Sequence, residues 1–144
     1  MAEGEDMKTK KAKPVTHEEY SDNHAMVQRV EEGLPVMEVV QFGKQAGFTT
    51  EELARLIQIP ARTYARRVAG KARLKVHEGE RAARLMRLFD RAREVFGTDD
   101  NVRKWLHAEL PALGWRTPID FAQTEPGARE VENLIGRIEH GVFS

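Results

Sequence analysis

The chain has 144 residues, which suits one domain or two small helical modules that share a core. It contains no cysteine, and this excludes disulfides, thiolate metal sites and a cysteine nucleophile. No apolar run approaches the roughly 20 residues of a transmembrane helix, and the N-terminus lacks the apolar core of a signal peptide. The composition therefore predicts a soluble, cytoplasmic protein with no membrane partner.

The formal net charge is zero, but the charges are unevenly distributed along the chain. Between Glu52 and Glu78 no residue is acidic and seven are basic, namely Arg55, Arg62, Arg66, Arg67, Lys71, Arg73 and Lys75. Residues 118–144 instead carry five acidic side chains against Arg129 and Arg137. One part of the molecule thus suits phosphates, and another suits a different partner.

Residues 1–21 are polar and charged, with a basic cluster at Lys8, Lys10, Lys11 and Lys13. Such a segment cannot bury enough apolar surface to fold alone, so we expect a disordered tail that is either solvated or in contact with DNA. From Asp22 onward helical signals dominate and no strand alternation is sustained. The predicted fold class is therefore all-α.

A helix-turn-helix module is predicted over residues 22–76. Leu34-Pro35 opens a helix with proline in its first turn, and Gly47 ends it. Thr49 and Glu52 then form a capping box for a short helix at 50–58. Pro60 begins a second short helix over 61–69, which stops at Gly70. The two short helices and the break between them give the outline of the motif.

A long connecting helix follows within residues 77–97, with its periodic apolar positions running from Glu78 to Phe96. Residues 98–144 form a predicted small helical domain. Thr98 caps its first helix, and Thr117 before Pro118 caps a short helix that fades by Thr124. The last helix covers about 125–140 and carries one apolar stripe, Ala128, Val131, Ile135, Ile138 and Val142.

The helix-turn-helix pattern has the features of a DNA-binding module. Ala54 is small where the two helices must cross closely, and the apolar anchors around it are Leu53, Ile57, Ile59 and Tyr64. The outer side of the second helix and the segment after it carry the residues suited to base edges and phosphates. The predicted DNA contacts are Arg55, Ala61, Arg62, Thr63, Arg66, Arg67, Lys71 and Arg73. The alternative is a helical bundle whose arginines are only solvated.

No catalytic chemistry is indicated. The five histidines show no metal-ligand spacing, and no glycine-rich phosphate loop is present. His140 and Ser144 lack the supporting groups of a nucleophile and base. We therefore expect no enzyme activity, no metal, no cofactor and no small-molecule substrate.

Residues 116–120, 127–132 and 136–144 resemble the C-terminal toxin-binding domain of Xre/MbcA/ParS antitoxins. The helix-turn-helix and long helix upstream extend this resemblance to 34–144. It implies that the C-terminal domain covers the active site of a RES-domain toxin that destroys NAD⁺. The implied toxin-binding residues are Arg129, Asn133, Gly136, Arg137, Glu139, His140, Gly141, Val142, Phe143 and Ser144.

Three positions depart from the pattern of that family. Gln58 occupies a turn position where glycine is commonest, and Arg67 replaces an apolar anchor. Trp115 stands where a second glycine is common. The residues Val142-Phe143-Ser144 leave two possibilities open, because an apolar tip of this kind suits insertion into a partner's cleft but terminal apolar residues also fold back onto their own core.

The leading hypothesis is an antitoxin that neutralises a RES-domain toxin and represses its own operon by binding operator DNA. A homodimer is expected, because one recognition helix reads too few bases for operator specificity. The apolar stripe of residues 78–96 or the helix-turn-helix could form its interface. The alternative is a stand-alone repressor whose C-terminal domain only dimerises or binds another regulator.

Overall fold

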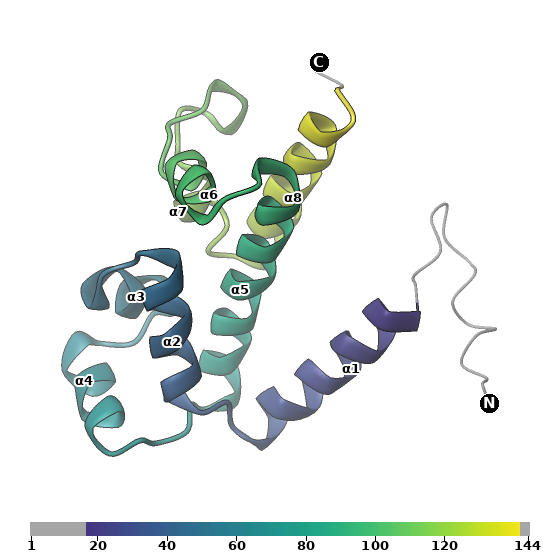
Figure 1. The fold of residues 1–144 in the computed structure, drawn as a ribbon. Coiled ribbons are helices and arrows are strands. Elements are labelled where there is room, and N and C mark those ends of the chain that lie inside the picture. Colours follow the sequence, from purple (N-terminus) through teal and green to yellow (C-terminus); the bar gives the residue numbers. More distant parts are fainter. Residues whose placement is uncertain (1–16, 142–144) are drawn as a thin grey trace.

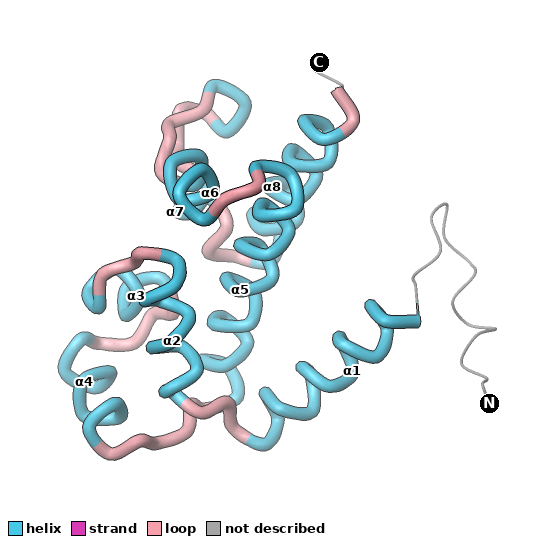
Figure 2. The backbone as a smooth tube through the Cα atoms, viewed as in Figure 1, coloured by secondary structure: helices cyan, strands magenta, loops and turns pink. Residues whose placement is uncertain are grey.

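The computed structural model describes residues 17–141, with side chains described from Asn23 onward. Within that range the chain forms eight α-helices, a short 3₁₀ helix and no strand, which confirms the all-α prediction (Figure 2). None of these helices is long and apolar enough to span a membrane. The helices are α1 (His17–Glu32), α2 (Val36–Ala46), α3 (Thr50–Leu56), α4 (Ala61–Ala69), α5 (Val76–Phe96), α6 (Asp99–Leu106), α7 (Pro118–Phe121) and α8 (Glu125–Glu139), and the 3₁₀ helix is Pro111–Leu113.

Helix α5 forms the axis of the molecule (Figure 1). Helices α2, α3 and α4 gather beside its N-terminal half, whereas α8 runs along its C-terminal half with α6 and α7 nearby. Helix α1 leads away from the lower end of this assembly. The helix-turn-helix module and the C-terminal helices are therefore built on one shared support.

The apolar stripe of α5 is buried inside the chain. Ala82, Leu85, Leu88, Phe89 and Ala92 are all buried in one core cluster. Complete burial of each leucine or phenylalanine stabilises the fold by about 1.5–3 kcal/mol, so these residues hold the two halves together. The idea that this stripe supplies a dimer interface is consequently wrong.

Aromatic side chains join the two halves at the middle of α5. Phe89 meets Phe42 of α2 edge to face at 5.5 Å between ring centroids, and Phe48 lies 6.3 Å away in a similar orientation. Phe48 in turn contacts the ring of His107, which follows α6. Edge-to-face aromatic pairs contribute about 0.5–1.5 kcal/mol beyond their buried area. The core is thus continuous from the helix-turn-helix to the C-terminal helices.

Threonine caps start most of the C-terminal helices and α3. The hydroxyls of Thr49, Thr98, Thr117 and Thr124 accept from backbone amides three residues later, at 3.0–3.2 Å. Each such cap contributes about 1 kcal/mol. The capping box predicted for α3 is only half formed, because the carboxylate of Glu52 contacts His107. Pro35 is the N-cap of α2 and does not lie in its first turn.

Several predicted boundaries need correction. Helix α1 begins at His17, within the segment predicted as a disordered tail, while residues 1–16 with their lysine cluster lie outside the described range. Helix α5 starts at Val76, two residues before Glu78, because the carboxylate of Glu78 accepts from the backbone amide of Lys75 at the start of the helix. Helix α3 ends at Leu56, because Gln58 already has a left-handed backbone with φ of 60°.

Candidate functional sites

Helices α3 and α4 form the helix-turn-helix. Ala54 is buried at the crossing, and Tyr64, on the inner face of α4, is only 2% exposed. Burial of its hydroxyl raises the pKa of Tyr64. The turn contains Gln58 in the left-handed conformation, which explains why glycine is common at this position. Gln58 is exposed, so its side chain can adopt this backbone without a clash in the core.

The outer face of α4 presents a set of available cations. Arg62, Arg66 and Lys71 are exposed and form no ion pair among the residues that the structure describes. Ala61 is exposed beside them, and Thr63 is half-buried. Since a recognition helix uses such a face for base edges and phosphates, this surface is the candidate DNA interface.

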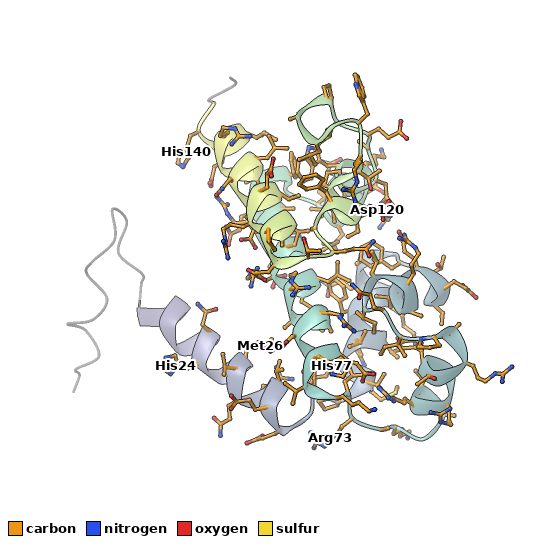
Figure 3. All side chains as sticks on the ribbon, turned by 180° about the vertical axis from the view of Figure 1, so that it is seen from behind. His24, Met26, Arg73, His77, Asp120 and His140 are labelled. Carbon is orange, nitrogen blue, oxygen red and sulfur yellow. The ribbon has the colours of Figure 1, made fainter. Side chains whose placement is uncertain are left out.

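Arg73 extends this surface beyond α4. It is exposed, although Nη1 donates to the carbonyl oxygen of Gly33 at 2.6 Å. That bond holds the arginine at the junction of α1 and α2 while leaving its other nitrogens for a phosphate. Arg73 and His140 lie at opposite ends of the molecule, so the DNA surface is remote from the C-terminal end of α8 (Figure 3).

Arg67 does not belong to the exposed set. Its guanidinium forms an ion pair with Glu78 of α5, and both side chains are largely buried. Burial by itself would raise the pKa of Glu78, but the amide of Lys75 and the ion pair with Arg67 outweigh it, so the pKa is lowered. Arg67 therefore takes the place of the apolar anchor by linking α4 to α5, and its predicted role in DNA contact gives way to a structural one.

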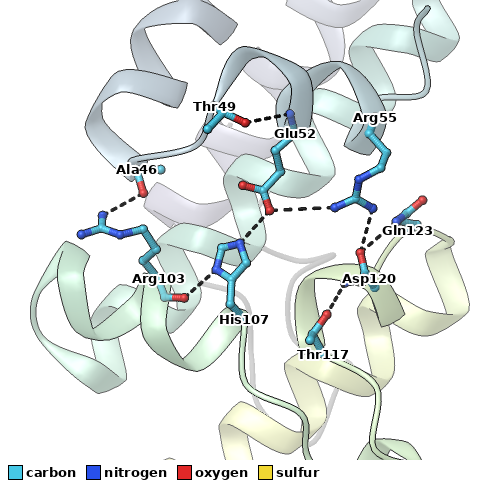
Figure 4. Close-up of polar contacts among 9 residues, drawn as sticks. All are labelled: Ala46, Thr49, Glu52, Arg55, Arg103, His107, Thr117, Asp120 and Gln123. Atoms are coloured by element: carbon cyan, nitrogen blue, oxygen red, sulfur yellow. Dashed lines mark hydrogen bonds and ion pairs between the residues drawn. The ribbon is translucent and has the colours of Figure 1, made fainter.

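Arg55 points toward the C-terminal half of the chain (Figure 4). It donates to Asp120 of α7 at 2.9 Å, and its other nitrogen lies 3.9 Å from Glu52. Burial would raise the pKa of Asp120, but the hydrogen bond and charge of Arg55 dominate and lower it. Arg55 is half-exposed, yet its guanidinium is occupied by this junction and is less available to DNA than Arg62 or Arg66.

The same junction contains His107, which was not predicted (Figure 4). Its Nε2 lies 2.6 Å from the carboxylate of Glu52, and Nδ1 lies 2.7 Å from the carbonyl oxygen of Arg103. Both neighbours are acceptors, so only the doubly protonated ring satisfies both. Desolvation lowers the pKa of His107, but these acceptors outweigh it and raise the pKa overall.

Arg103 completes the junction. Its Nη1 donates to the carbonyl oxygen of Ala46 at the end of α2, at 3.0 Å. A carbonyl at the C-terminal end of α2 has no partner within its own helix, and Arg103 supplies one from α6. Three polar links therefore connect the helix-turn-helix to α6 and α7, and none of them could be found from local sequence patterns because their partners lie 55–65 residues apart.

Helix α8 is fixed on α5 by a ladder of ion pairs above its buried stripe. Arg84 contacts Glu125 at 3.1 Å, Arg87 contacts Glu132 at 2.8 Å and Arg91 contacts Glu139 at 2.6 Å. Underneath, Ala128, Val131 and Ile135 of the predicted stripe are buried, Ile138 is half-buried, and Val142 lies outside the described residues. The acidic residues of the C-terminal segment thus serve mainly to hold α8 in place.

An open groove lies along the C-terminal part of α8. It is lined by Arg91, Glu132, Asn133, Gly136, Arg137 and His140, so the structure brings four of the predicted toxin-binding residues together. Arg129 is exposed one turn earlier, and Glu139 is exposed but forms an ion pair with Arg91. Gly141 is exposed beyond the helix, while Val142, Phe143 and Ser144 lie outside the described residues.

Gly136 is the unusual member of this groove. It lies inside α8, where glycine costs about 1 kcal/mol relative to alanine. Among the described residues, a Cβ atom at this position would meet only Arg91, at 3.9 Å, which is an ordinary contact. At Gly127 the opposite holds, since a Cβ there would overlap the carbonyl oxygen of Phe121. The packing of the chain therefore requires Gly127 but does not require Gly136.

No group of three or more histidine, aspartate or glutamate side chains is placed to hold a metal ion in the part of the chain that the structure describes. The arrangement consists of two surfaces at opposite ends of a rigid helix. One is positively charged around α4, and the other is a groove on α8. Both are suited to binding macromolecules.

Comparison with known proteins matches these two surfaces to two domains. Residues 25–87 match the family model described as the antitoxin Xre-like helix-turn-helix domain. Residues 91–141 match the antitoxin Xre/MbcA/ParS C-terminal toxin-binding domain. The division between the two matches falls within α5, which therefore contributes to both.

The chain is also similar to curated antitoxins over most of its length. It is 40% identical to Antitoxin Xre of Photorhabdus laumondii over 114 residues, which cover 78% of this chain and 77% of the relative. It is 37% identical to Antitoxin Xre of Yersinia enterocolitica over 120 residues, covering 83% and 81%. A third relative, Antitoxin Xre of Pseudomonas putida, is 26% identical over 113 residues, covering 78% and 70%.

Proposed function

The chain belongs to the Xre antitoxin family, and from this premise we propose that it neutralises a RES-domain toxin that degrades NAD⁺ and represses the operon encoding both proteins. Family membership establishes an antitoxin with a helix-turn-helix domain and a toxin-binding domain. The identity of the toxin, the repression and the oligomeric state are the proposed steps.

The groove on α8 is the observation that carries the toxin-binding part of the proposal. It is lined by Asn133, Arg137 and His140 around a glycine that the packing of the described residues does not need. A bare backbone patch inside a helix allows close approach of a partner, which would offset the lost helix stability. We infer that the toxin packs against Gly136, with Val142–Ser144 entering its active-site cleft and blocking NAD⁺.

The cations around α4 support the DNA-binding part. Arg62, Arg66, Lys71 and Arg73 form the revised contact set, with Ala61 and Thr63 near the base edges. Arg55 and Arg67 are left out because their partners are Asp120 and Glu78. One such surface reads only a few base pairs, so we propose that two copies bind half-sites about 34 Å apart, or a multiple of this distance.

The two activities can be tested in the same cells. The product of the neighbouring toxin gene is expressed alone, with the full chain, or with a version that ends at Gly141, and NAD⁺ and growth are measured. We expect the toxin alone to deplete NAD⁺ and the full chain to restore it. The shortened version retains all of α8 and should fail to restore NAD⁺.

A second arm uses R62A/R66A with a reporter gene under the operon's promoter. These arginines lie far from the groove, so repression should be lost while NAD⁺ remains protected. The exposed cation Lys104 on α6 provides the control, because K104A removes a similar charge away from α4. If the full chain neither binds nor neutralises the neighbouring protein but still represses, the stand-alone repressor replaces this proposal.

A further inference from the structure

Trp115 combines two features that the fold does not explain. The residue is 65% exposed, one of the largest apolar surfaces left open in the part of the chain that is described. Its backbone is also left-handed, with φ of 67°, directly after Gly114 with φ of 66°. A bulky residue is rarely found in this conformation, because its Cβ crowds the neighbouring carbonyl.

The loop that carries Trp115 is held firmly. The amide of Trp115 donates to the carbonyl oxygen of Leu110 at 2.8 Å. The amide of Leu110 donates in turn to the carbonyl oxygen of Arg116 at 3.2 Å. Leu113 anchors the loop in the core at 3% exposure. The indole is therefore presented on a fixed backbone, so little conformational entropy remains to be lost when a partner binds it.

The rest of the chain gains little from the tryptophan. Trp105, by comparison, is half-buried and stacks with Phe96 at 5.0 Å between ring centroids. At position 115 a glycine would relax the backbone without emptying any core space. An exposed tryptophan on a fixed and strained backbone is thus a feature suited to binding a partner.

We propose that Trp115 is an anchor that inserts into an apolar pocket on the toxin and helps to select this toxin over others. The inference rests on the proposed function. Trp115 lies within the match to the toxin-binding domain. Its loop also lies at the same end of the molecule as the C-terminal end of α8, away from α4 (Figure 1). The neighbouring Arg116 folds over Phe121 at 5.1 Å, which leaves the indole as the projecting apolar group.

The decisive variant is W115G, because it removes the ring and the backbone strain together. Affinity for the purified neighbouring toxin should fall at least about 30-fold, as for other buried tryptophan anchors. The Tm of the free protein should rise by about 2 °C. W115A, which keeps the Cβ, should lose the same affinity without the rise in Tm, and W115F should recover part of the affinity. V76A is the matched control, since Val76 is an exposed apolar residue at the start of α5, and it should bind normally.

A direct readout uses antitoxin labelled with 5-fluorotryptophan and unlabelled toxin. The chain has two tryptophans, so the ¹⁹F spectrum has two resonances, and W105F assigns them. On toxin binding, the resonance of Trp115 should shift and become protected from solvent, while that of Trp105 should remain nearly unchanged. This measurement does not depend on the stability of any variant at position 115.

The outcomes separate this inference from the proposed function. If wild-type protein does not bind the neighbouring toxin, the proposed function fails and the anchor fails with it. If wild-type protein binds and W115G binds equally well, with no ¹⁹F shift at Trp115, the anchor alone is wrong. If W115G instead weakens self-association in light scattering while toxin affinity is unchanged, the loop contacts a second copy of the chain and the anchor is again wrong.

Discussion

Gly43 in α2 and Gly136 in α8 are both glycines inside helices, one at the DNA-binding end and one at the toxin-binding end. A Cβ at position 43 would overlap the buried side chain of Leu53, so α2 and α3 can pack closely only with glycine there. At position 136 no comparable neighbour lies among the described residues. The first glycine is explained by packing inside the chain, whereas no contact among the described residues explains the second.

The same contrast holds for the residues that depart from the family pattern. Arg67 replaces an apolar anchor, but its positive charge is paired with Glu78 within the chain. Trp115 replaces a glycine, and no described contact of its side chain compensates the strained backbone. Natural chains break local rules mainly where function requires it, so uncompensated departures identify binding surfaces. Gly136 and Trp115 both lie in the part of the chain that matches the toxin-binding domain.

The largest expected effect concerns the buried ion pair of Arg67 and Glu78. R67A leaves the Glu78 carboxylate buried without its cation, and we expect the free energy of unfolding to fall by about 3 kcal/mol. R67M/E78Q removes both charges, while the side-chain amide that replaces the carboxylate can still accept from the backbone amide of Lys75, so stability should largely return. Chemical denaturation of both variants measures the difference. Operator affinity of the folded double variant should match wild type, and a loss there would restore Arg67 to the DNA contacts.

The two glycines provide the next test, with effects of opposite sign. G43A should lower the free energy of unfolding by about 1 kcal/mol, because overpacking against Leu53 exceeds the gain in helix propensity. G136A should raise it by about 1 kcal/mol, because the new methyl group meets no obstacle and favours the helix. Thermal unfolding measures both effects.

Toxin binding completes the comparison of the glycines. G136A should bind the neighbouring toxin at least about tenfold more weakly, because one methyl group would hold the partner away from the backbone of α8. G43A should bind the toxin normally once it is folded. Equal toxin binding by wild type and G136A would show that the groove is not part of the interface.

These contrasts also explain how much the sequence could reveal. Helix ends, threonine caps and the stripe of α8 follow from signals within a few residues, and most were predicted correctly. The sequence also identified Gln58 as a turn residue at a position where glycine is commonest, and its backbone is left-handed. The roles of Arg55 and Arg67 were not, because a positive charge on an outer face gives no information about its partner. Glu78 is 11 residues beyond Arg67, and Asp120 is 65 residues beyond Arg55.

A smaller effect is expected at Lys71, which lies just after α4 and has a left-handed backbone with φ of 51°. If its ammonium neutralises one phosphate, K71A should reduce the salt slope of operator binding by about one unit. Titrations of operator DNA at several salt concentrations measure this slope. K104A, the charge-matched change on α6, should leave it unaltered. An unchanged slope for K71A, with normal affinity, would remove Lys71 from the interface.

The smallest effect concerns His107 at the junction between the two ends. Its pKa is raised in the folded chain because Glu52 and the Arg103 carbonyl favour the protonated ring. The stabilisation is therefore complete below about pH 6.5, the ordinary histidine pKa, and is lost as pH rises through the higher folded value. Since the pair is partly exposed, the change should amount to a few tenths of a kcal/mol. Unfolding of wild type and H107Q from pH 5.5 to 8.5 measures it, with stability of the variant nearly flat over this window. A wild-type stability that rises with pH over the same range would contradict the protonated link, and the junction would then depend on Arg55 and Arg103 alone.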